Sequence, residues 1–546
     1  MIDGVAAWLR PGGDINRNYA QRNQNFPSTP LQSIAMVYAF DLPTTSHLSF
    51  QSYLSSRTHP SLPQSATTAR HAFRLALKAH SRLPRGPQRD SHLNSVLSAL
   101  NDYLPYLVAI AQGLNGRPID TTAAPSVPSA EEVEVSPRAE IEPEWRATLA
   151  SSSISLKSSR PTKSGRTRGP GIQYELAFTL TTLGYVLSSL ARSGVTRTLY
   201  ASSTPTTEQR TAAVQNAAKN LLQAASIHTL LSSSPYFTNG LEACVAPELA
   251  PASQVALSSL ALAEATLLAV LKDDSYVVAC IQARNPNDKD WMVRAPEIPK
   301  VRAHAFARLC IRAAEYADQA NTGLGSVGAG GKRAGIDEDF VSYTRVLGLV
   351  ARARACRFFG IDAELAGKIG DGIAWLRAAK AALGLRGSGS GEKETATKSR
   401  GLSKLKQGFR ERLEERRMEK GAGGERVEKG EFGPGDNAGR EEEGRVVEML
   451  ETKWVRMNDT INTQLIPSSA DYLANLPSGR DIYPAPAAFK LPSLDEEHLS
   501  RMRAPPTELD LPELEGEDSD VESPDALDTR ALTPGAFPDR PDSTYY

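Results

Sequence analysis

The sequence has few cysteines and no recognisable leader segment. Its four cysteines, Cys244, Cys280, Cys310 and Cys356, each lie in an apolar helical context without a partner at short spacing. We expect them to be reduced core residues of a cytoplasmic protein. The start, MIDGVAAWLRPGGD, has no basic stretch followed by an apolar one. We therefore expect no signal peptide.

Long apolar runs and net charge are also missing. Runs such as residues 106–112 are far shorter than the roughly 20 residues that a membrane-spanning helix needs, so we expect any membrane association to be peripheral and mediated by partners. The formal net charge is -1, which argues against binding of nucleic acid by bulk charge. The charges are nevertheless segregated: basic residues crowd residues 393–420, whereas fifteen acidic residues accompany four basic ones from Asp495 onward.

Helical periodicity dominates what remains. In residues 174–191 the leucines at 176, 180, 183, 187 and 190 form one stripe, and small or apolar residues cover a second face. This pattern predicts a helix buried among other helices. Mid-helix glycine costs roughly 1 kcal/mol relative to alanine, so Gly184 suggests that a neighbouring backbone comes close there.

The remaining segments predict an all-α fold with disordered additions. Further helices are expected at residues 69–80, 93–112, 208–234, 252–272, 301–320, 340–359, 362–385 and 445–463. They suggest tetratricopeptide-like helix pairs, although no 34-residue repeat is visible. We expect a disordered extension at 1–35, a helical domain at 36–485 with insertions at about 117–170 and 387–443, and a disordered acidic, proline-rich tail at 486–546. Met36 is an alternative start, and short extended pieces are expected around Trp145 and Ile154.

The second insertion contains one segment that allows two structural interpretations. Leu402, Leu405, Phe409 and Leu413 could line one face of a basic helix at residues 404–420, which would lie on an anionic membrane. Its glutamates and glycine-rich flanks favour a transient solvated helix instead.

The candidate catalytic motifs do not meet the requirements of the chemistry they suggest. Residues 323–328 match the G-x-G-x-x-G pattern, but a helix rather than a strand precedes them, so we expect an inter-helix loop. His304 and Cys310 are six residues apart on a helix, and their side chains should point to different faces. We expect no catalytic residues, no cofactor and no metal site, and an enzyme on a helical scaffold is the minor alternative.

The helix at residues 172–191 resembles the signature helix of the Bro domain, the helical module of Alix and related endosomal-sorting adaptors. The pattern is an aromatic residue followed by Glu, then Ala, then an apolar run into Gly. Here it is filled by Tyr174, Glu175, Ala177, Leu180, Leu183, Gly184 and Val186.

Other blocks follow in the order of that family. They are residues 262–265 with 271–272, 307–309 with 313–316, 370–376, and Met457–Ile461 with Ile466-Pro467. The resemblance spans roughly residues 40–482. Within the family, residues 40–45, 99–107 and 454–464 are most similar to the fungal members that act in ambient-pH signalling.

The resemblance implies an elongated, boomerang-shaped all-α domain, possibly with a small β element, that acts as a non-enzymatic adaptor. It would bind the C-terminal amphipathic helix of an ESCRT-III subunit at the plasma membrane or endosome. There it would help to assemble the complex in which a calpain-like protease activates a transcription factor. A general endosomal-sorting adaptor is the alternative. The tail sequence Tyr483-Pro484-Ala485-Pro486 resembles a docking peptide of such adaptors but lacks the usual leucine.

The resemblance also implies the residues of the partner-binding patch. Leu309 matches a patch leucine, whereas Ala305 and Ala269 replace a usual isoleucine and a usual aromatic residue. Phe306, next to Ala305, could compensate in part. Losing an isoleucine-sized contact at such a site costs on the order of 1 to 3 kcal/mol. A purely structural role in the core stays open for all four residues.

Overall fold

The computed structural model describes residues 37–120, 130–150, 166–201, 204–240, 246–282, 300–327, 335–385 and 438–505. The basic segment at 404–420, Ile154, Cys244, Met36 and the acidic tail beyond residue 505 lie outside these ranges. Residues up to Arg503 belong to one compact unit, and a second unit begins at Ala504.

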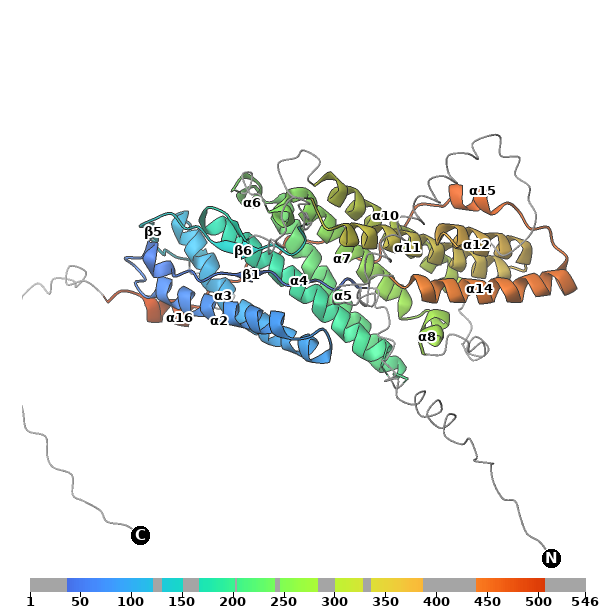
Figure 1. Cartoon of the computed structure of the whole chain (residues 1–546), viewed down its shortest axis with the longest axis horizontal. Helices are drawn as coiled ribbons and strands as arrows, with labels where there is room; N and C mark the ends of the chain where they lie inside the picture. Colours follow the sequence, from blue (N-terminus) through green and yellow to red (C-terminus); the bar gives the residue numbers. More distant parts are fainter. Residues whose placement is uncertain are drawn as a thin grey trace, which may run out of the picture. The chain divides into compact units, whose positions relative to one another are not determined.

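Long helices that follow one another in the chain pack against one another (Figure 1). They are α2 (Leu62–Arg82), α3 (Pro87–Leu114), α4 (Gly171–Leu199), α5 (Thr207–Ser233), α7 (Pro251–Leu271), α10 (Lys300–Ser326), α11 (Glu338–Leu365), α12 (Ile369–Ala382) and α14 (Arg440–Met457). Each contacts the next in this order. The prediction of an all-α array of packed helices is confirmed.

Shorter elements connect these helices. They are η1 (Phe50–Ser52), α6 (Pro235–Gly240), η2 (Pro247–Leu249), α8 (Ser275–Gln282), η3 (Asn458–Asn462), α15 (Ser469–Ala474) and α16 (Glu496–Met502). The last predicted helix, at 445–463, is thus α14 ending at Met457 and a π-helical turn, η3. The turn ends at Thr463, which has a left-handed backbone with φ of 46°.

The expected small β element is also present. β1 (Thr44–Thr45), β6 (Glu144–Arg146) and β7 (Thr167–Arg168) form an antiparallel sheet in the order β1-β6-β7. Two further pairs join β2 (Leu54–Ser55) to β5 (Ser136–Pro137) and β3 (Ile119–Asp120) to β4 (Ala130–Glu131). The extended piece predicted at Trp145 is therefore confirmed, and Trp145 itself is fully buried.

Helix α4 is buried as its sequence predicts. Every residue from Tyr174 to Ser188 is buried. The neighbour of Gly184 differs from our expectation: a Cβ atom there would lie 2.5 Å from Nε2 of His228 on α5, so a side chain rather than a backbone fills the space. Glu175, also fully buried, accepts hydrogen bonds from Arg70 Nε (2.8 Å), Tyr103 Oη (3.0 Å) and Trp145 Nε1 (2.7 Å). It therefore ties α2, α3, α4 and the sheet together.

Helix α7 is long and apolar enough to span a membrane, with a mean hydropathy of 1.7. The sequence predicted only short apolar runs, because Ser, Gln and Glu interrupt the apolar residues of α7. Their number is too small to make the helix polar on average. However, 89% of its most apolar stretch is buried inside the fold. Such burial is typical of a central helix in a soluble helical array.

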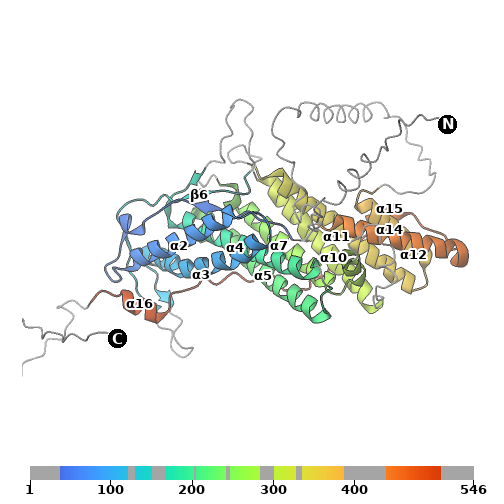
Figure 2. The ribbon, with the colours of Figure 1, turned by 60° about the horizontal axis from the view of Figure 1, so that its bottom comes forward.

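The chain returns across the array after α15. Residues 475–495, which we call the strap, have no regular secondary structure and lead to α16. Figures 1 and 2 both draw α16 beside α2 and α3, while α15 packs on α12. Residues 486–503, which we had expected in the tail, are described here, and Leu494 and Leu499 are buried.

Candidate protein-interaction site

The described residues do not form a metal site. None of them belongs to a group of three or more His, Cys, Asp or Glu side chains that could hold a metal ion. His304 is exposed and lies 3.7 Å from Asp362, whereas Cys310 is fully buried. Gly323 and Gly325 lie within α10 rather than in a phosphate-binding loop. The first half of the predicted inter-helix loop is therefore helical.

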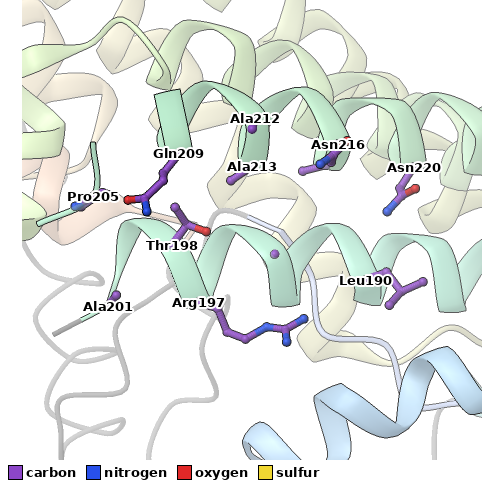
Figure 3. A pocket seen from close by; sticks show the side chains of 12 residues that line it. Leu190, Arg197, Thr198, Ala201, Pro205, Gln209, Ala212, Ala213, Asn216 and Asn220 are labelled. Atoms are coloured by element: carbon purple, nitrogen blue, oxygen red, sulfur yellow. The ribbon is translucent and has the colours of Figure 1, made fainter. Parts of the chain in front are cut away.

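An open groove of about 630 Å³ lies between the surfaces of the packed helices α4 and α5. Figure 3 shows Leu190, Arg197, Thr198 and Ala201 on the α4 side and Gln209, Ala212, Ala213, Asn216 and Asn220 on the α5 side. Arg197 is the single charged residue among those that line it. The lining holds no His, Cys, Asp or Glu, so no acid or base lies beside the hydroxyl of Thr198 among these residues.

The residues implied by the resemblance lie on α7 and α10, which pack together. A Cβ atom on Gly323 would lie 3.1 Å from the carbonyl oxygen of Ala252, so the end of α10 meets the start of α7. The two helices are therefore antiparallel. This arrangement brings Ala269, near the end of α7, to the level of the first turns of α10, where Ala305 and Leu309 lie.

One stripe of α10 combines candidate residues with charged ones. Ala305, Leu309, Arg312 and Tyr316 follow at steps of four, three and four and so share one side of the helix. Ala269 and Ala305 are half-buried, and Leu309 is 8% exposed. Phe306 lies off this stripe, with its ring centroid 5.4 Å from that of Phe358 on α11. Ala305 and Leu309 thus lie on the same side of α10, whereas Phe306 points toward α11.

The strap lies on the same stripe. Arg308 Nε donates to the carbonyl oxygen of Ser478 (3.2 Å), and the Arg480 N–H donates to the carbonyl oxygen of Arg308 (3.1 Å). A Cβ atom on Gly479 would lie 2.5 Å from Cα of Arg312, so only glycine allows this approach. The Gly479 N–H donates to Oε1 of Glu315 (3.0 Å).

Asp481 anchors the next part of the strap. Its Oδ1 accepts hydrogen bonds from Arg312 Nε (2.7 Å) and Tyr316 Oη (2.6 Å). Burial alone would raise the pKa of Asp481, but the hydrogen bonds from Tyr316 and Arg312 hold that pKa below its ordinary value. The pKa of Arg312 is raised, chiefly by its hydrogen bonds to Glu315 and Asp481. Asp481 is therefore ionised at neutral pH.

Sequence reasoning did not anticipate the strap. In the sequence, the strap-binding residues look like an ordinary polar helix face; they are Arg308, Arg312, Glu315 and Tyr316. Their partners lie more than 160 residues away in the chain. A usable signal was the spacing of Leu476, Tyr483, Phe489 and Leu491, which are half-buried against the core. Such apolar residues in a proline-rich segment indicate that the segment packs on the fold.

Comparison with known sequences finds one strong similarity. No protein-family model matches the chain. The chain is 75% identical over 514 residues to the pH-response regulator protein palC of Emericella nidulans, and the match covers 94% of this chain and 100% of that protein.

Solved structures give weaker likenesses. A complex of the ALIX BRO1 domain with CHMP4C has a TM-score of 0.45 at 15% identity and covers 85% of this chain and 100% of that one. ALIX in complex with a late-domain peptide of SIVmac239 has a TM-score of 0.49 at 13% identity and covers 86% and 51%. Likenesses of this size carry no argument about function.

Proposed function

The chain belongs to the family of the pH-response regulator protein palC, and from this membership we propose that it binds the C-terminal amphipathic helix of an ESCRT-III subunit on the outward side of α7 and α10. It acts as a regulator and adaptor rather than as an enzyme. The observation that carries the proposal is the stripe of α10 on which Ala305 is half-buried and Leu309 keeps 8% of its surface exposed. Ala269 lies at the same level on α7.

This surface suits a docked helix. An amphipathic helix binds by placing apolar side chains at i, i+3 and i+4 into a shallow groove on a rigid support. Here α7 and α10 provide the support, since α7 is buried along most of its length. The small side chains of Ala269 and Ala305 leave room for large anchors on the partner.

The expected affinity is modest. With alanine at two positions where the family carries larger residues, each missing contact costs on the order of 1 to 3 kcal/mol. A polymer of ESCRT-III subunits offsets this loss, because it presents many copies of the helix at high local concentration. We infer that the chain accumulates where the polymer forms, at the plasma membrane or endosome. There it helps to assemble the complex in which a calpain-like protease activates a transcription factor.

The test is binding of the full chain to a labelled peptide of the ESCRT-III C-terminal helix, measured by fluorescence anisotropy. We expect Leu309→Asp to weaken binding at least tenfold, because a charge replaces an apolar contact. Ile311→Asp is the matched control, since Ile311 is similarly buried on α10 but lies off the stripe, and urea denaturation checks that both variants remain folded. Unchanged binding by Leu309→Asp would refute the assigned face, and absence of binding by the wild type would refute the function.

A growth assay at alkaline pH separates this function from that of a general sorting adaptor. Deletion of the gene is expected to abolish growth at alkaline pH while leaving endosomal sorting of membrane cargo intact. Loss of cargo sorting with normal alkaline growth would favour the general adaptor.

A further inference from the structure

We infer that the strap forms a second wall of the partner-binding face and that Arg480 selects a partner helix with acidic residues beside its apolar stripe. The inference rests on the proposed function and specifies the partner chemistry of the same site. It adds a basic side chain from a distant part of the chain to a surface otherwise built by α7 and α10.

The strap is fixed beside the candidate residues by its backbone. Two hydrogen bonds join it to Arg308, which is adjacent to Leu309 and one helical turn from Ala305. Gly479 packs directly on the α10 backbone, where a Cβ atom would lie 2.5 Å from Cα of Arg312. The strap therefore borders the stripe beside Leu309 and leaves Ala305 half-buried.

Arg480 is held at this boundary with its side chain exposed. Its backbone N–H donates to Arg308, yet its guanidinium makes no ion pair with any residue in the described ranges. An arginine side chain presents several N–H donors in a planar fork that suits carboxylates. Arg480 is thus an exposed cation whose backbone is fixed to Arg308, the neighbour of Leu309.

The charges around the face favour an acidic partner. Glu315 and Asp481 share one cation, Arg312, so this group carries one net negative charge, which Arg308 and Arg480 together outweigh. At the other end of the face, Asp273 lies near both Lys272 and Arg302. Basic side chains are therefore in excess, which steers an acidic helix toward the face and fixes its orientation.

Charge reversal at Arg480 tests the inference in the full chain. We expect Arg480→Glu to weaken binding of the ESCRT-III helix peptide roughly three- to tenfold at low ionic strength, because an attraction becomes a repulsion. The difference from the wild type should shrink at high ionic strength. Lys490→Glu is the matched control, since Lys490 is an exposed cation on the same strap. It should bind like the wild type.

Other outcomes overturn the inference. Equal effects of Arg480→Glu and Lys490→Glu would show that only the net charge of the chain matters. Tighter binding by Arg480→Glu or by Asp481→Asn would show that the strap covers the site. If Leu309→Asp abolishes binding and Arg480→Glu does not change it, the proposed function stands and the role of the strap is refuted. If the wild type does not bind the peptide, both are refuted.

Discussion

Two arginine–carboxylate contacts, one in the interior and one on the outer side of α10, show different uses of the same chemistry. Arg70 and Glu175 are almost completely inaccessible, and Tyr103 and Trp145 complete the hydrogen bonds of the carboxylate. Arg312 and Asp481 are 28% and 48% exposed. The interior contact joins elements of the array, whereas the surface contact holds the strap.

The two contacts should differ in energy because they differ in solvation. A buried pair is costly to break, since the remaining charge has no partner and no water. An exposed pair contributes little, because water and salt screen it and two side chains must be ordered. The interior of the array is therefore expected to resist change, while the strap can be altered without unfolding the protein.

The largest effect is expected at Glu175. Glu175→Ala removes the acceptor of three buried donors, so it should lower the free energy of unfolding by about 3 to 5 kcal/mol. Urea denaturation followed by the fluorescence of tryptophan, including the buried Trp145, measures the change. The matched surface variant is Asp481→Ala. If the two variants lose the same free energy, the distinction between the interior and the strap is wrong.

A third buried carboxyl, Glu264 on α7, sharpens the comparison through pH. Burial raises the pKa of Glu264 to about 7, against the lowering effect of hydrogen bonds from Tyr38 N–H and Tyr343 Oη and of the charge of Arg192. Between the ordinary pKa and about 7 the folded protein holds a proton that the unfolded chain has lost. Stability from this group should therefore fall as pH rises through that window, by on the order of 3 kcal/mol, and stay constant above it.

Glu264→Gln tests this prediction, because glutamine keeps an oxygen acceptor but does not titrate. Relative to the wild type, the variant should gain stability between about pH 5 and pH 8. Urea midpoints measured across that range give the difference directly. A constant difference between the two proteins would mean that the pKa of Glu264 is not raised.

How much of this could be predicted from the sequence depends on the range of the interactions. The burial of α4 follows from periodicity within 18 residues, and the extended piece at Trp145 from local composition. The bond from Trp145 to Glu175, the His228 ring against Gly184 and the strap on α10 join residues 30 to 170 positions apart. No local pattern encodes such contacts. Leu309 could be predicted as a partner-binding residue only from the resemblance to a family, and Arg480 could be identified only from the structure.

The smallest effect is expected at the surface contact itself. Asp481→Asn retains the shape of the side chain but removes its charge, so the global free energy of unfolding should change by less than about 1 kcal/mol. Local release of the strap should still increase, because the pair with Arg312 is lost while the backbone bonds to Arg308 remain. Trypsin cleavage after Lys490, whose flanking residues are unchanged in this variant, reports this release. Asp459→Asn, at an exposed site beyond α14, is the control. A large drop in global stability, or unchanged cleavage, would mean that the strap belongs to the rigid interior and not to a surface that can be adjusted for binding.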